Sequence, residues 1–312
     1  MSGADRSSLA DWRREVDREL DRLLAPAPGI PPRLLEAMRH AVFAGGKRLR
    51  PLLALAAAEA AGGEPRIALP VAAGLEMIHT YSLVHDDLPA MDNDDLRRGK
   101  PTVHVVFGEA LAILAGDGLL TRALEVLASE PGPGEIRPDN PRLEEAEFAA
   151  RRARVVALVA DAAGPAGMVG GQADDLEATG AAATPGDASL LNSIHRRKTG
   201  ALITASLLAG AVTAGANESV LDRLRCYGEA VGLAFQIVDD ILDVESTTEV
   251  LGKSAGKDQR DTKLTFPTLL GIEASRRRVE ELRQTALDEV ARLGPGAARL
   301  GELAGLIASR SH

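Results

Sequence analysis

The sequence "AAGLEMIHTYSLVHDDLPAMD", residues 72–92, leads from an apolar helix directly into a cluster of carboxylates. Apolar residues recur in it mainly at three- and four-residue intervals, a period that indicates an α-helix. Pro89 should distort or end that helix, and we expect Asp92 to turn back toward Asp86. Like charges packed this closely repel one another unless a cation joins them. The stretch therefore predicts a helical protein with a cation site at one helix end.

The same helical period continues along most of the chain. Ala and Leu are abundant, runs of β-branched residues are scarce, and Pro/Gly-rich breaks separate the periodic segments. The Pro/Gly-rich loop at about 130–141 is the best candidate for a linker, but no composition shift accompanies it. We therefore expect one all-α domain over residues 1–312. The expected helices are 8–24, 32–62, 67–88, 103–129, 142–178, 188–213, 219–245, 266–292 and 297–310.

Composition and charge exclude several classes of partner. The chain of 312 residues has a net charge of -9, which should repel nucleic acid and acidic membranes. Cys226 is the single cysteine, so an internal disulfide is excluded and a reducing compartment is expected. The charged N-terminus lacks the apolar core of a signal peptide. The weakly polar run from Gly200 to Ala216 is too short to span a bilayer, and we interpret it as a buried helix. These features predict a cytoplasmic protein without a membrane span.

A second acidic cluster lies in "FQIVDDILDV", residues 235–244. Asp239 and Asp243 are four residues apart and Asp240 and Asp243 three apart, so one helix face can present all three. A solvated acidic face is the alternative, but the segment is otherwise apolar and should lie largely in the core. Carboxylates without His or Cys companions favour Mg²⁺ or Mn²⁺ over zinc.

Basic residues adjoin both acidic clusters. Arginine forks suit the oxygens of a diphosphate, and lysines act on them as point charges. Each of these residues alone would usually be a solvated surface group, but several adjoin an apolar helix or an aspartate cluster. His79 lies seven residues before Asp86, nearly in line with it on the helix. The basic set is Lys47, Arg48, Arg50, Arg97, Arg98, Lys198, Lys253, Lys257 and Lys263.

These motifs together resemble those of the trans-isoprenyl diphosphate synthases. The resemblance covers nearly the whole chain, through "GGKRLRP", "DDLPAMD", "GGQADDL", "HRRKTGAL", "DDILD", "LGKSAGKD" and "TKLTFP" in the family's order. Among subfamilies the chain is most similar to bacterial farnesyl diphosphate synthases, because the first motif carries the two extra residues Pro89-Ala90. The resemblance implies a single-domain bundle of antiparallel helices around a deep central cavity, assembled as a homodimer.

The resemblance also implies a role for each matching residue. Asp86 and Asp92 would bind two Mg²⁺ with the support of Asp87, and Asp239 would bind a third, assisted through water by Asp240 and Asp243. The allylic diphosphate would be held by Arg97, Lys198, Lys253 and Lys263. Isopentenyl diphosphate would be bound by Lys47, Arg50, His79 and Arg98. Thr199 and Gln236 would lie beside the reacting allylic carbon, and Gln172 near the metals.

The implied reaction condenses isopentenyl diphosphate with dimethylallyl or geranyl diphosphate, head to tail, and gives farnesyl diphosphate (C15). Tyr81, beside Ser82 one helical turn below Asp86, is the expected limit to chain length, although it could simply pack in the core. The alternatives are a geranylgeranyl diphosphate synthase (C20), a class I terpene cyclase and a non-catalytic subunit of a heteromeric synthase. A cyclase needs no second diphosphate pocket, and a non-catalytic subunit tends to lose one aspartate motif.

Overall fold

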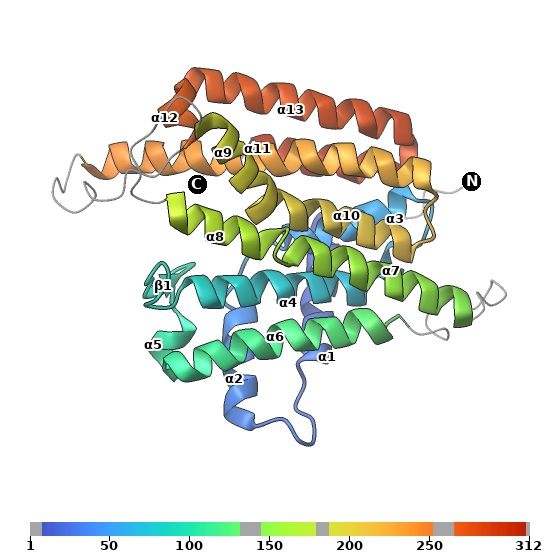
Figure 1. Cartoon of the computed structure of the whole chain (residues 1–312). Coiled ribbons are helices and arrows are strands. Elements are labelled where there is room, and N and C mark those ends of the chain that lie inside the picture. Colours follow the sequence, from blue (N-terminus) through green and yellow to red (C-terminus); the bar gives the residue numbers. More distant parts are fainter. Residues whose placement is uncertain (1–7, 132–144, 179–186, 252–264, 310–312) are drawn as a thin grey trace.

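The computed structural model describes residues 8–131, 145–178, 187–251 and 265–309, and nearly all of them are helical (Figure 1). The expectation of an all-α fold is confirmed. The first half contains α1 (Leu9–Leu23), α2 (Pro32–Val42), α3 (Leu49–Ala60), η1 (Pro65–Ala68), α4 (Leu69–Asp86), β1 (Leu96–Arg97), β2 (Lys100–Pro101), α5 (Val103–Phe107) and α6 (Glu109–Ser129). The second half contains α7 (Glu145–Ala163), α8 (Met168–Ala178), α9 (Asp187–His195), η2 (Arg196–Gly200), α10 (Ala201–Thr213), α11 (Glu218–Leu251), α12 (Phe266–Leu270), α13 (Ile272–Leu293), η3 (Pro295–Ala297) and α14 (Ala298–Ala308).

Four of the expected helices are broken where a single helix was predicted. Residues 32–62 divide into α2 and α3, 103–129 into α5 and α6, 142–178 into α7 and α8, and 266–292 into α12 and α13. Gly108 and Gly271 separate two of these pairs with φ of 88° and 82°, and Gly45 and Gly46 lie between α2 and α3 with φ of 107° and 133°. Pro165 lies in the fourth break. Helical periodicity runs through such turns unchanged, because one positive φ redirects the chain without altering the apolar pattern.

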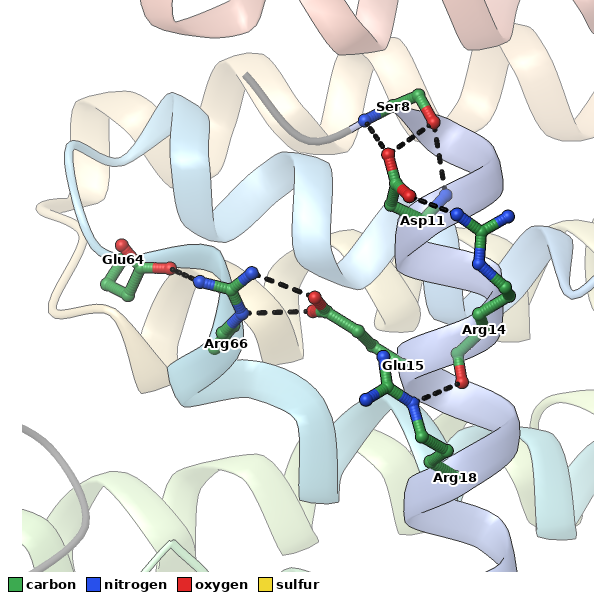
Figure 2. Close-up of polar contacts among 7 residues, drawn as sticks. All are labelled: Ser8, Asp11, Arg14, Glu15, Arg18, Glu64 and Arg66. Atoms are coloured by element: carbon green, nitrogen blue, oxygen red, sulfur yellow. Dashed lines mark hydrogen bonds and ion pairs between the residues drawn. The ribbon is translucent and has the colours of Figure 1, made fainter. Parts of the chain in front are cut away.

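The N-terminal helix α1 is fixed by local polar contacts (Figure 2). The Ser8 hydroxyl accepts from the Asp11 backbone N–H at 3.1 Å, while the Asp11 carboxylate accepts from the Ser8 backbone N–H at 2.8 Å. This capping box satisfies backbone donors that the first turn leaves unpaired. Arg66 donates twice to Glu15, at 3.1 and 2.8 Å, and so ties η1 to α1.

The core is built around α4, α10 and α11. In the packing, α4 contacts α6, and α10 contacts α3, α7 and α11, while α13 covers α11 (Figure 1). The residues of α10 from Leu207 to Thr213 are all buried, which confirms the buried helix expected at Gly200–Ala216. At Gly210 an added Cβ would lie 2.0 Å from the Ala54 carbonyl oxygen, so α10 and α3 approach to backbone contact. This packing fixes the position of the end of α4 and of the part of α11 that carry the acidic motifs.

Two stretches are long and apolar enough to cross a bilayer by length and composition alone, Pro65–Asp86 and Ala146–Ala178. The first is mostly buried against other helices of the protein. The second includes the break between α7 and α8. Core helices of globular proteins pass the same test, so two such stretches are only weak evidence of a membrane span.

Candidate active site

The first acidic motif begins where α4 ends. The backbone N–H of Asp92 donates to the carbonyl of Asp86 at 2.8 Å, and that of Asp94 donates to the carbonyl of Asp87 at 3.2 Å. The chain therefore turns back after Pro89, as predicted. Burial raises the pKa of Asp86 to about 6, and the charges of Asp92 and Asp87 add to the rise. A divalent cation at this point would relieve the repulsion between Asp86 and Asp92.

The carboxylate of Asp87 contacts the β1–β2 hairpin. It accepts from Nε of Arg97 at 2.9 Å, and Arg97 also lies 3.3 Å from Asp94. Burial raises the pKa of Asp87, although the guanidinium of Arg97 opposes the rise. Arg97 engages the carboxylate of Asp87 through Oδ1, and the support of the metals by Asp87 stays a prediction. Asp94 is exposed.

The second arginine, Arg98, lies in the turn of the same hairpin. Arg98 has φ of 54° and is followed by Gly99 with φ of 75°, so these two residues form the tight turn between β1 and β2. The Arg98 guanidinium donates to the carbonyl of Gly45, in the turn between α2 and α3. That contact joins the first acidic motif to the segment "GGKRLRP".

A cluster of cations lies beside Arg98. Arg50 is 7% exposed, and its Nε has no hydrogen-bond partner. Burial lowers the pKa of Arg50 to about 10, with Arg98 adding to the shift and Glu76 and Asp239 opposing it. Burial also lowers the pKa of His79 well below its usual value, and Arg50 and Arg98 lower it further. An anion bound here would give the buried guanidinium of Arg50 its missing acceptor.

The segment "GGKRLRP" contains two further basic residues, Lys47 and Arg48, which lie in different surroundings from Arg50. Lys47 is exposed in the turn that carries Gly45. Arg48 is as buried as Arg50 but differs in its partners, because its guanidinium bonds Asp17 and Glu76. Of the basic residues expected from this segment, the structure therefore groups Arg50 with His79 and Arg98 and directs Arg48 into the core.

A further part of the candidate site, called here the Lys198 wall, is formed where η2 packs against α8. Nζ of Lys198 donates to Asp175 at 2.6 Å, and Lys198 is close enough to Asp86 to lower the pKa of that carboxyl. At Gly171 an added Cβ would lie 2.3 Å from the Lys198 backbone nitrogen, so only glycine permits this approach. Sequence reasoning did not identify Asp175 as the partner of Lys198, although the motif "GGQADDL" contains it.

Thr199, Gln236 and Asp240 form a chain of hydrogen bonds along this wall. The Thr199 hydroxyl donates to Oε1 of Gln236 at 2.9 Å, and Nε2 of Gln236 donates to Asp240 at 3.2 Å. Asp240 also accepts from the backbone N–H of Phe266 at 3.1 Å and lies 3.4 Å from Nε2 of His195. Near this wall, Oε1 of Gln172 is buried without a hydrogen-bond partner.

The three aspartates of the second motif differ in their surroundings. Asp239 is half-buried and close enough to Arg50 to raise the pKa of that guanidinium. Asp240 is 5% exposed and engaged as described, and Asp243 is exposed. Asp240 is therefore held by Gln236 and Phe266, while the metal roles of the three aspartates stay predictions.

The donor set fits divalent metal ions that are completed by a ligand. Asp86, Asp92 and Asp239 offer hard carboxylate oxygens of the type that Mg²⁺ binds. Within the described residues, no three His, Cys, Asp or Glu side chains already form a metal-binding group. Oxygens of a diphosphate would therefore have to supply part of the coordination. Lys253, Lys257 and Lys263 lie outside the described residues.

The fold and the site define a class of protein. Carboxylates of both acidic motifs lie near cations, Asp86 near Lys198 and Asp239 near Arg50, and Nε of the buried Arg50 has no acceptor. Such a site suits substrates that carry diphosphates, held by metals on one side and by guanidiniums on the other. An all-α bundle with these motifs is a prenyltransferase that acts on prenyl diphosphates.

Comparison with known proteins gives the family. The family model for polyprenyl synthetase matches residues 31–293. The chain is 44% identical to a farnesyl diphosphate synthase of Geobacillus stearothermophilus, over 97% of each protein. It is 45% identical to a dimethylallyltranstransferase of Fischerella ambigua (strain UTEX 1903), over 97% of this chain and 83% of that protein. The chain belongs to the polyprenyl synthetase family, and the resemblance found in its motifs is confirmed.

Other relatives have different product names. A geranylgeranyl diphosphate synthase of Cyanophora paradoxa is 45% identical over 91% of this chain and 90% of that protein. The crystal structure of an FPP/GFPP synthase from Zymomonas mobilis superposes with a TM-score of 0.81 at 39% identity, covering 96% of this chain and 97% of that one. The chain is thus a short-chain trans-prenyltransferase of the farnesyl or geranylgeranyl type. Divalent metal is general in this family.

Proposed function

We propose that this chain is a farnesyl diphosphate synthase, which condenses isopentenyl diphosphate with dimethylallyl or geranyl diphosphate in a head-to-tail reaction. The observation that carries the proposal is that each acidic motif has a carboxylate close to a cation from another helix. Asp86 of α4 lies in the field of Lys198, and Asp239 of α11 lies in the field of Arg50. These two effects support the proposal that both acidic motifs, each with a cation beside it, line one site for two diphosphates.

In this proposal the allylic diphosphate binds between Asp86, Asp92 and Asp239, with Lys198 as a point charge on its oxygens. Three Mg²⁺, or Mn²⁺ in their place, would polarise this diphosphate as a leaving group. Arg97 is an allylic-site residue only if it exchanges its contact with Asp87 for the ligand. The loop lysines Lys253 and Lys263 remain predicted members of the same subsite.

Isopentenyl diphosphate is proposed to bind at Arg50, Arg98 and His79, with Lys47 at the rim. The unpartnered Nε of the buried Arg50 supports an anion at this point. His79, held neutral among the arginines, can accept or donate one hydrogen bond without adding charge. The double bond of the bound isopentenyl group then attacks the allylic carbon as its C–O bond breaks.

The positive charge that develops on the allylic carbon faces Thr199 and Gln236 in this proposal. The Thr199 hydroxyl donates its proton to Gln236, so its oxygen lone pairs remain for the cation. The final proton has no dedicated base among the described residues near Thr199, and the departed diphosphate is the proposed acceptor.

The C15 product is supported by Tyr81. Tyr81 is 8% exposed, its pKa is raised by burial and by Asp86, and its ring packs against His85 at 5.7 Å between centroids. A bulky ring directly below the first motif leaves little depth for a longer chain. Ser82, whose hydroxyl donates to the His79 carbonyl at 2.8 Å, is the second proposed chain-length position. Geranylgeranyl diphosphate is the alternative product, favoured by the names of several relatives.

We also propose one domain that includes the segment 130–141, a cytoplasmic location and a homodimer. The separate cluster at Arg50 argues against a terpene cyclase, and two intact aspartate motifs argue against a non-catalytic subunit. Incubation of the purified chain with labelled isopentenyl diphosphate, Mg²⁺ and each allylic starter tests the function. A C15 alcohol after dephosphorylation supports the proposal, whereas cyclised hydrocarbon or no condensation overturns it.

A further inference from the structure

Arg48 connects four helices through one buried side chain. It is the N-cap residue of α3 and has φ of 52°, a conformation that a residue with a side chain rarely adopts unless it is held. Its guanidinium donates to Asp17 of α1, to Glu76 of α4 and to the carbonyl of Val42 at the end of α2, at 2.8, 2.8 and 2.9 Å. The turn between α2 and α3 is therefore anchored from three directions.

Glu76 is the buried partner in this network. It is 2% exposed and lies on α4 three residues before His79. Its charge raises the pKa of Arg50 and of Arg98, in opposition to burial. The hydrogen bond from Arg48 fixes this carboxylate in the core, so the same anion holds the turn and acts on the charges of Arg50 and Arg98.

The anchored turn also carries the other contacts of the basic cluster. Lys47 and Arg50 lie one residue before and two residues after Arg48. The carbonyl of Gly45, in the same turn, accepts from Arg98. A displacement of the turn would thus move Lys47, Arg50 and the acceptor of Arg98 together.

We propose that the Arg48–Glu76 pair is a positioning device for the isopentenyl diphosphate pocket and does not itself touch the substrate. This inference rests on the proposed function of the cluster at Arg50. Two apolar or neutral residues of similar volume can often replace a buried ion pair without loss of stability. The role of the charged pair is then to hold Lys47 and Arg50 in the positions that the pocket needs.

The test separates stability from position. Arg48→Met and Glu76→Gln each leave one buried charge without its partner and are expected to melt at lower temperature. The double variant Arg48→Met/Glu76→Gln removes both charges and should regain most of the melting temperature. We expect its KM for isopentenyl diphosphate to stay raised about tenfold or more, with the KM for the allylic substrate unchanged and a smaller change in kcat. A double variant with wild-type KM for isopentenyl diphosphate would overturn the proposal.

A second variant covers the case in which the double variant does not fold. Glu76→Asp keeps the charge but withdraws the carboxylate by one methylene from Arg48. A raised KM for isopentenyl diphosphate alone is the expected result, and an unchanged KM in this folded variant contradicts the inference. The matched control is Arg66→Met/Glu15→Gln, a paired removal at the α1–η1 contact shown in Figure 2, which should leave every kinetic constant unchanged.

Arg50→Met distinguishes this inference from the proposed function. If Arg50→Met leaves the KM for isopentenyl diphosphate unchanged, the proposed pocket itself is wrong. If Arg50→Met raises that KM while Arg48→Met/Glu76→Gln does not, the pocket is correct and the positioning role of the pair is rejected.

Discussion

The hydroxyl of Thr199 donates to Oε1 of Gln236 over 2.9 Å, across the contact between η2 and α11. Gln236 is itself oriented by Asp240, which accepts from its Nε2 at 3.2 Å. The order of donors and acceptors in this chain leaves the lone pairs of the Thr199 oxygen uncommitted. That oxygen is thereby suited to face a positive charge.

Thr199→Val is expected to lower kcat by about 100-fold, because it removes a fixed dipole from the reacting carbon at nearly constant volume. Thr199→Ser keeps the hydroxyl and should retain most of the rate. Single-turnover kinetics with saturating substrates would measure the difference. Equal rates for the valine and serine variants would exclude this role for the hydroxyl.

Asp86→Ala and Asp239→Ala are each expected to cut turnover by about 100-fold or more, because each removes an oxygen ligand for the ions that polarise the leaving group. Helical content by circular dichroism should not change. Asp95→Asn serves as the control, since the Asp95 side chain is 83% exposed and its loss should leave the rate unaffected. Near-normal turnover in either alanine variant would rule out the metal assignment for that residue.

Asp86→Asn is expected to stabilise the metal-free protein. Folding raises the pKa of Asp86 from 3.8 to about 6, so the folded state binds more protons than the unfolded state between these values. The resulting stabilisation is fully present below pH 3.8 and is lost as the pH rises through about 6. At pH 8 the neutral Asn avoids the burial of a charge, at most about 3 kcal/mol. Melting in EDTA should show the variant above wild type at pH 8, with the gap closing toward pH 4. A gap that is constant with pH would show that the charge of Asp86 does not cause the difference in stability.

Asp240→Asn should have the opposite effect on the metal-free protein. The Asp240 carboxylate accepts from Phe266 and Gln236, and an amide in its place would turn an NH₂ group toward one of these donors. Loss of that buried hydrogen bond costs about 1–3 kcal/mol. Melting in EDTA at pH 8 compares both variants directly. A rise in melting temperature for Asp240→Asn, like that expected for Asp86→Asn, would show that its carboxylate is not a structural acceptor.

Tyr81→Ala should lengthen the product toward C20 or beyond, because it removes the ring below the first motif. Chromatography of the dephosphorylated products measures chain length. Tyr227→Phe is the control, since Tyr227 is the other tyrosine and is fully buried, with its hydroxyl donating to the Leu300 carbonyl at 2.7 Å. Products of unchanged length from Tyr81→Ala would reject Tyr81 as the limit.

The two acidic motifs differ in how far the sequence alone could predict their surroundings. The turn of Asp92 toward Asp86 follows from Pro89 and from the end of one helix, so the sequence alone could predict it. The different surroundings of Asp239 and Asp240 follow from the helices packed against α11, which lie far away in the sequence. Helical spacing gives directions about one helix axis, but it does not show which neighbour occupies each direction.

The sequence by itself determined the helical class, the position of both acidic motifs and the family, because helical period and short-range spacing are properties of local chain chemistry. Only the tertiary structure decided that Arg48 pairs with Glu76 in the core while Arg50 remains without an acceptor for its Nε. Two arginines in one short segment look alike as a pattern of charge. Both are buried, and their roles separate because Arg48, with φ of 52°, reaches the buried carboxylate on α4, whereas Nε of Arg50 has no partner.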